Sequence, residues 1–207
     1  MVMKKVIGIC GLIGHGKDTA ASFLLQEGFQ RISFAGALKD ACANIFGWDR
    51  ILLEGNTTES RVFRETVDKW WANRLDIPQF TPRYVLQNVG TNVFRQHFHP
   101  DIWVAACERQ IEMTDKNVVI SDCRFFNELE VIKRFGGKTA VVWRNDKPEW
   151  WETASMENRG HKQANMSANY PEVHPSEWSW AGWEFDMELD NRGTMEDLAI
   201  STYKLIS

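Results

Sequence analysis

One stretch of the sequence decides the fold: Gly11-Leu12-Ile13-Gly14-His15-Gly16-Lys17-Asp18-Thr19. It fits the pattern G-x-x-x-x-G-K and stands between an apolar run, residues 6–10, and a segment with helical spacing, residues 17–26. A strand, this turn and a helix in that order are typical of a phosphate-binding P-loop. Glycines at 11, 14 and 16 let backbone N–H groups face a phosphate, while the helix start and the Lys17 charge add attraction. A simple glycine-rich turn is the weaker interpretation.

The residue after Lys17 departs from the usual pattern. Serine or threonine normally stands there and binds Mg²⁺ through its hydroxyl group, but this chain has Asp18 and then Thr19. Asp18 is a candidate Mg²⁺ ligand, directly or through water, and is equally well explained as a favourable acid in the first helical turn. Thr19 either supports the loop or takes the metal. We expect the His15 side chain to point outward, because only its backbone is needed at the phosphate.

Further strands and helices follow the P-loop in alternation. The expected strands are residues 6–10, 29–34, 117–121, 139–143 and 185–189, and the expected helices are residues 17–26, 37–46, 59–74, 82–95, 101–113, 127–135 and 194–205. Residues 145–175 show no clean period. This order predicts an α/β fold with a mainly parallel five-stranded sheet and helices on both faces. Ligands in such folds bind beyond the carboxyl ends of the strands.

Charged residues stand where two of these strands end. Asp122 and Arg124 follow the strand at 117–121, so Asp122 is a candidate Mg²⁺ ligand and Arg124 a candidate for an acceptor phosphate or for charge in transfer. A pair between the two side chains, or a cap on the next helix, is the alternative. Arg144 ends the strand at 139–143, and a catalytic role and a solvated loop position are evenly balanced for it.

Two more arginines lie in the helix expected from Pro82. Arg83 and Arg95 are about 120° apart on an ideal helix, because twelve residues make roughly 3.3 turns. They could border one pocket, although each alone is better explained as a surface residue. Tryptophans gather near the C-terminus, and packing is a better explanation for them than base stacking: Trp150, Trp151, Trp178, Trp180 and Trp183.

The bulk composition excludes some classes of function. The net charge is −4, which argues against a broad surface for a nucleic acid polymer or an acidic membrane, although a local basic pocket is compatible with it. We expect that residues 1–10 do not form a signal peptide, and no apolar stretch approaches the length of a membrane span. The four cysteines are scattered, so we expect reduced, buried thiols in a cytoplasmic protein.

Four strings together resemble a known family: GLIGHGKDTAA, LQNVGTNVFRQHFHPDIWV, ISDCRFFNELEVIKRFGG and ELDNRGTMEDL. They are similar to the deoxynucleoside monophosphate kinases of tailed bacteriophages, in which the Gly-Lys-Asp-Thr form of the P-loop is typical. The resemblance implies a P-loop nucleoside monophosphate kinase fold in a single domain, residues 1–207. Its core would be residues 1–46, 115–144 and 184–207, with an acceptor-binding helical region at about 47–114 and a lid at about 145–175.

The resemblance also implies site residues. The P-loop and Lys17 would hold ATP with Mg²⁺, and Asn191 would lie near adenine. Arg83, Arg95 and Arg124 would face the acceptor, and Arg144 would begin the lid. The string from His174 to Glu177 also resembles a family string, without an assigned role. A phage-encoded kinase would work in the host cytoplasm, and a homodimer is left open.

The expected reaction is transfer of the ATP γ-phosphoryl group to a deoxynucleoside monophosphate. One alternative is a P-loop kinase of another small molecule, such as dephospho-coenzyme A or phosphomevalonate, because a P-loop does not report the acceptor. The other is an ATP-binding regulatory module without catalysis. The sequence does not say which bases are accepted.

Overall fold

The computed structural model describes residues 4–207. Residues 1–3, on which part of the signal-peptide prediction rests, lie outside the described residues. The chain forms two compact units, which we call the sheet unit (residues up to Phe34, and Gln110–Ser207) and the helical unit (Ala35–Arg109). The first boundary differs from the predicted one near residue 47. The reason is that Leu38 and Cys42, in the helix predicted as core, pack with residues of the helical unit such as Trp48 and Phe80.

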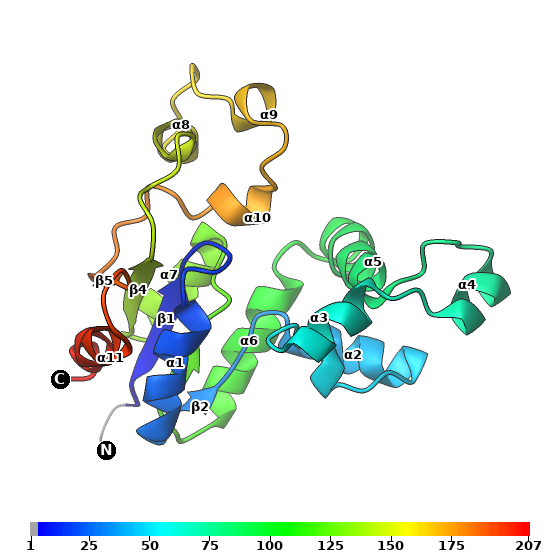
Figure 1. Ribbon diagram of the computed structural model, residues 1–207, viewed down its shortest axis with the longest axis horizontal. Coiled ribbons are helices and arrows are strands. Elements are labelled where there is room, and N and C mark those ends of the chain that lie inside the picture. The colour runs from blue at the N-terminus through cyan, green and yellow to red at the C-terminus, as the bar shows by residue number, and fades with distance from the viewer. Residues whose placement is uncertain (1–3) are drawn as a thin grey trace. The chain divides into compact units, whose positions relative to one another are not determined.

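The sheet unit contains five parallel strands in the order β2-β3-β1-β4-β5, which confirms the predicted α/β class (Figure 1). The strands are β1 (Val6–Cys10), β2 (Gln30–Arg31), β3 (Val118–Ile120), β4 (Lys138–Trp143) and β5 (Met187–Asp190). The helices of this unit are α1 (Lys17–Gln26), α7 (Phe126–Arg134), α8 (Trp151–Asn158), α9 (Met166–Asn169), α10 (Pro175–Trp178) and α11 (Met195–Tyr203).

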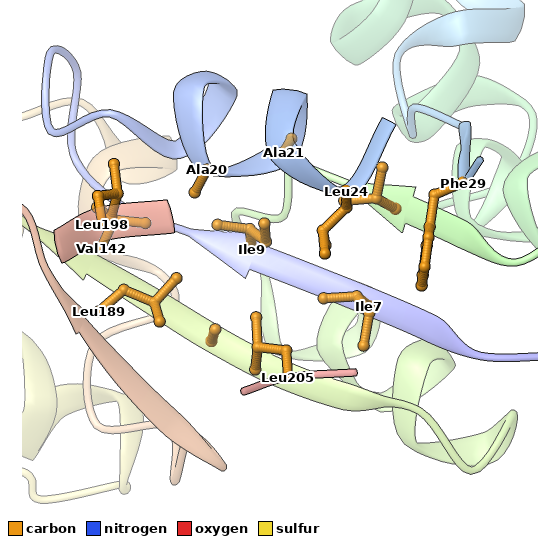
Figure 2. Close-up of a cluster of buried hydrophobic side chains, with 12 residues drawn as sticks. Ile7, Ile9, Ala20, Ala21, Leu24, Phe29, Val142, Leu189, Leu198 and Leu205 are labelled. Atoms are coloured by element: carbon orange, nitrogen blue, oxygen red, sulfur yellow. The ribbon is translucent and has the colours of Figure 1, made fainter. Parts of the chain in front are cut away.

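The central strand β1 is buried on both faces. Ile7 and Ile9 lie in one apolar cluster with Leu24 of α1 and Leu198 of α11 (Figure 2). On the other face a Cβ at Gly8 would press against Ile132 of α7, so only glycine allows that helix to approach. Helices therefore cover both faces of the sheet, as the apolar run predicts.

The helical unit packs its own apolar core. Its elements are α2 (Gly36–Phe46), η1 (Ile51–Leu53), α3 (Thr58–Glu65), α4 (Lys69–Leu75), α5 (Pro82–Gln87) and η2 (Asn88–Arg95), and α6 (Ile102–Met113) contains the second boundary. The single helix expected at 59–74 is wrong, because Thr66 is extended and Asp68 caps a new helix. The helix expected from Pro82 also changes at Asn88 into a wider π-helix.

The segment predicted as irregular contains a two-turn helix, α8. Its sequence lacks an amphipathic stripe because the residues it buries are small, Ala154 and Ser155. The anchor of the segment is aromatic: the Trp151 ring packs against Trp143 at 4.9 Å and against Trp180 at 5.0 Å, between ring centroids. These tryptophans therefore pack, as expected.

Two further observations concern the whole described chain. None of the four cysteines forms a disulfide bond, and all four are buried, as predicted. No helix within residues 4–207 is both long enough and apolar enough to cross a bilayer.

Candidate active site

The carboxyl ends of four parallel strands bring most of the predicted site residues to one edge of the sheet. Gly8 of β1 is opposite Ile120 of β3, and Trp143 of β4 is opposite Asp190 of β5. Cys10 of β1 is opposite Val141 of β4. The residues directly after these strands therefore meet at the same edge: the P-loop from Gly11, Asp122 with Arg124, Arg144 and Asn191.

The Asn191 side chain lies against the P-loop at Gly16 and His15. Gly16, directly before α1, has φ +99°, a backbone conformation that side-chain-bearing residues rarely adopt, and a Cβ there would collide with the Asn191 amide. That amide donates to the carbonyl oxygen of His15 at 2.8 Å, and the Asn191 backbone N–H donates to Trp143 at 2.7 Å. Asn191 thus braces the loop against β4, whereas its role near adenine stays a prediction.

The expectation that the His15 side chain points outward is wrong. The ring is 5% exposed and lies edge-on to Trp143, with 5.7 Å between centroids. Its Nδ1 accepts from the Arg144 backbone N–H at 3.3 Å, which fixes Nδ1 as unprotonated. Burial lowers the pKa of His15 and a hydrogen bond to the Val142 backbone opposes this, so the ring stays neutral at neutral pH. The ring therefore supports the loop, and the His15 backbone N–H donates to the carbonyl oxygen of Leu12 at 3.2 Å.

Lys17 and Arg124 form the positive part of the site. Burial lowers the pKa of Lys17, and the neighbouring Arg124 charge lowers it further, while Asp18 and Glu177 raise it. Among residues 4–207, the Lys17 ammonium makes no hydrogen bond or ion pair. A partly desolvated ammonium beside a second cation is stabilised by an anion, and a nucleotide phosphate supplies one.

Asp18 takes part in a network that the sequence did not predict. Its carboxylate forms an ion pair with Arg31, at the end of β2, and accepts from the Ser121 hydroxyl group at 2.8 Å. Arg31 also donates to that hydroxyl oxygen at 2.6 Å. No spacing in the sequence joins these three positions, because Arg31 and Ser121 meet only through the pairing of β2 with β3.

Asp122 binds the chain at Ser33 and Phe34, where the first segment of the sheet unit ends. Its carboxylate accepts from the Ser33 hydroxyl group at 2.6 Å and from the Phe34 backbone N–H at 3.2 Å. Asp18 lies in the first turn of α1 and Asp122 follows β3, and carboxylate oxygens such as theirs are ligands that fit Mg²⁺. Among the described residues there is no group of three or more His, Cys, Asp or Glu side chains able to hold a metal by themselves. Mg²⁺ does not need such a group, since one or two carboxylates with substrate phosphates suffice.

Arg124 is held by residues of the string 174–177, to which the sequence analysis assigned no role. Its Nη1 donates to Glu177 at 2.6 Å and to Ser176 at 3.2 Å, both of α10. Glu177 also accepts from the Ile13 backbone N–H of the P-loop at 3.3 Å. An open pocket of ≈ 440 Å³ lies here, lined by P-loop residues such as Leu12 and by residues of the 148–177 segment. Figure 1 shows α10, in orange, above the blue loop between β1 and α1.

The remaining arginines stay predictions. Arg83 and Arg95 belong to the helical unit, where Arg83 forms an ion pair with Glu65 and Arg95 ends the π-helix η2. Arg144 follows β4 with an exposed side chain, and its backbone contacts His15.

Comparison with known proteins places this chain in a family. No protein-family model matches the chain. A protein of Acanthamoeba polyphaga mimivirus, provisionally named a deoxynucleotide monophosphate kinase, is 36% identical over 151 residues, which are 64% of this chain and 70% of the relative. The chain belongs to the deoxynucleotide monophosphate kinases. The kinase also matches the deoxynucleoside-5'-monophosphate kinase of Escherichia phage T5, 44% identical over 54 residues, 26% of the chain and 22% of the relative.

Two other proteins are also similar to the kinase. Dephospho-CoA kinase of Streptococcus pneumoniae is 32% identical over 87 residues, 35% of the chain and 43% of the relative. A solved structure from Thermus thermophilus is 19% identical with a TM-score of 0.49, covering 98% of this chain and 96% of that one.

Proposed function

We propose that this kinase transfers the γ-phosphoryl group of ATP to the phosphate of a deoxynucleoside monophosphate. The observation that carries the proposal is that Lys17 and Arg124 are neighbouring cations beside the P-loop. The loop itself is held by the hydrogen bond from the Asn191 amide to the His15 carbonyl oxygen. The names of the mimivirus and phage T5 relatives support the acceptor. The pocket beside the loop is in the size range of small-ligand sites.

The reaction needs no covalent enzyme intermediate. An ionised oxygen of the acceptor phosphate attacks the γ-phosphorus, and the bond to the oxygen that bridges the β- and γ-phosphates breaks, which gives ADP and the deoxynucleoside diphosphate. Because the attacking oxygen is already ionised, no general base is required. Catalysis then depends on position and on neutralising charge.

Each group of residues has a proposed task. The P-loop N–H groups and Lys17 bind the ATP phosphates, and Arg124 neutralises charge on the transferred group or the acceptor phosphate. Mg²⁺, when bound, neutralises further charge, and Asp18 and Asp122 would hold it or its waters. Arg83 and Arg95 bind the acceptor, and Arg144 begins the segment that covers the site. The π-helix that ends at Arg95 supports this, because such helices are frequent at functional sites.

One rival acceptor rests on a specific observation, the similarity to dephospho-CoA kinase. The deciding experiment measures ADP release by the purified protein with Mg-ATP and each of dAMP, dCMP, dGMP, dTMP, their ribonucleotides and dephospho-coenzyme A. We expect turnover with one or more deoxynucleotides. Turnover with dephospho-coenzyme A alone would replace the acceptor, and ATP binding without any turnover would indicate a regulatory module.

A further inference from the structure

The string His174-Pro175-Ser176-Glu177 forms a short, well-defined turn. The His174 ring caps α10 by accepting from the Ser176 backbone N–H at 3.2 Å, and its Nδ1 lies 2.9 Å from the Ser176 hydroxyl oxygen. Pro175 takes the first helical position, for which its fixed φ is suited. The string therefore presents the Ser176 and Glu177 side chains together.

Both side chains contact the same nitrogen of Arg124. Ser176 and Glu177 accept from Nη1, and within residues 4–207 the Nε and Nη2 atoms of this guanidinium have no hydrogen-bond partner. A carboxylate that merely neutralised the arginine would be expected to take two of its nitrogens in a fork. Here one corner of the guanidinium is held, and its other donors remain available to an oxyanion.

The second oxygen of Glu177 joins this contact to the P-loop. Oε2 accepts from the Ile13 backbone N–H, so one carboxylate links the loop that holds phosphate to Arg124. The Glu177 side chain is 18% exposed, so solvent screens its interaction with Arg124 less than it screens an ion pair at the surface.

We propose that Ser176 and Glu177 are positioning residues, which hold Arg124 at a fixed place relative to the P-loop for phosphoryl transfer. The assignment rests on the proposed function. The competing explanation is that Glu177 occupies a phosphate position until ATP displaces it. The two explanations predict different effects of removing the carboxylate. Loss of a positioning residue lowers kcat, whereas loss of a competitor lowers the KM for ATP.

The first test does not depend on catalysis. Phenylglyoxal modifies accessible guanidinium groups, and mass spectrometry of peptides gives the rate at Arg124 in the wild type, Glu177→Gln, Ser176→Ala and Glu184→Gln. Glu184 is exposed and serves as the matched control. We expect Glu177→Gln to speed modification several-fold, Ser176→Ala to speed it less, and Glu184→Gln to leave it unchanged. An unchanged rate in Glu177→Gln would overturn the proposal.

The second test is a double-mutant cycle on turnover with Glu177→Gln and Arg124→Ala. A small misplacement of a catalytic group lowers the reaction rate up to about 10²-fold. We therefore expect Glu177→Gln to lower kcat roughly 10- to 100-fold, while the KM for ATP changes less than about threefold. In the Arg124→Ala background the same change should lower kcat less than about twofold, because the two residues act as a unit.

Two results of the cycle would reject positioning: full additivity, or an unchanged kcat with a lower KM for ATP. Thermal melting confirms that each variant is folded, and Ser176→Ala, which removes the hydroxyl contacts with Arg124 and with the His174 ring, replaces Glu177→Gln if the latter does not fold. A wild-type protein that transfers to no acceptor would reject the proposed function, while the modification rates would still decide whether Glu177 holds Arg124.

Discussion

Gly16 is a position at which the phosphate loop tolerates little change. Its φ of +99° and the adjacent Asn191 amide leave no room for a side chain. Gly28 provides a matched control, since it has φ +82° but open space where a Cβ would stand. Both substitutions by alanine introduce the backbone strain of a left-handed conformation, about 1–2 kcal/mol. Only Gly16→Ala also displaces the loop and the Asn191 amide from each other.

We therefore expect Gly16→Ala to raise the KM for ATP at least about tenfold, since loss of one hydrogen bond to a charged group costs about 1.5–3 kcal/mol. Gly28→Ala should lower the free energy of unfolding and leave the KM for ATP unchanged. Steady-state kinetics and urea unfolding of the two variants separate the effects. A Gly16→Ala enzyme with the wild-type KM would show that the brace has no influence on nucleotide binding.

Single residues differ in how far the sequence predicts them. Lys17 and the loop glycines follow from a local pattern, because their function depends on neighbours in the chain. His15 and Glu177 do not. The His15 ring is buried through contacts with Trp143 and Arg144, and Glu177 meets Arg124 across 53 positions of the chain. Such contacts depend on the folded sheet.

Among the elements, the segment that follows β4 is attached to the sheet by tryptophans. Trp180 is 1% exposed and packs with Trp143, Trp151 and Phe185. We expect Trp180→Ala to reduce the free energy of unfolding by about 3–5 kcal/mol, the usual cost of deleting a buried large aromatic side chain. Trp70→Ala, at a ring that is 63% exposed, should cost much less in the same urea titration. Equal losses would contradict the anchoring role.

A second element-scale prediction concerns pH. Asp186 joins α7 and β4, because it accepts from Lys133 and from the backbone N–H of Thr139 at 2.6 Å. Burial acts to raise the pKa of Asp186, but these hydrogen bonds prevail and hold it below its ordinary value of 3.8. A depressed pKa in the folded state means that the contribution to stability is present above pH 3.8 and is lost as the pH falls through the folded value.

The Asp186→Asn variant tests this. It should be less stable than the wild type at pH 7, and the difference should shrink below pH 3.8, as measured by urea unfolding at each pH. Asp115→Asn, at an exposed position, is the control for removing one carboxylate. A difference that is constant from pH 7 to pH 3 would show that ionisation of Asp186 is not the cause.

Elements with a strong local signal were predicted well. Helix α1 and the central strands follow from apolar periodicity, and Thr194 begins α11 through a capping box. The break at Thr66, the π-helix from Asn88 and the helix α8 were missed. In each case side-chain contacts within the folded unit outweigh the local pattern, as with the tryptophan rings that hold α8.

At the scale of the whole molecule, the proposed site residues are divided between two units of the chain. Lys17 and Arg124 belong to the sheet unit, and Arg83 and Arg95 to the helical unit. We propose that Lys17 acts on ATP, that Arg124 acts on the transferred group or the acceptor phosphate, and that Arg83 and Arg95 act on the acceptor. The sequence predicts both sets, but spacing along the chain cannot establish that they act together.

We expect Arg83→Met and Arg95→Met each to raise the KM for the deoxynucleotide roughly tenfold or more, the cost of one hydrogen bond to a charged group. The KM for ATP should change little. Arg61→Met, at an exposed arginine of the same unit, is the matched control. An effect on ATP alone would move these arginines to the donor side of the reaction.

The central claim is group transfer between two nucleotides, and the fate of the γ-phosphate tests it most directly. Purified protein is incubated with Mg-ATP labelled with ³²P at the γ-phosphate and with the preferred deoxynucleoside monophosphate, and the products are separated. We predict that the label appears in the deoxynucleoside diphosphate, and that Lys17→Ala lowers the rate by on the order of 10³ while Lys162→Ala does not. Label recovered only as inorganic phosphate or in ATP, or a Lys17→Ala enzyme as fast as the wild type, would contradict the account.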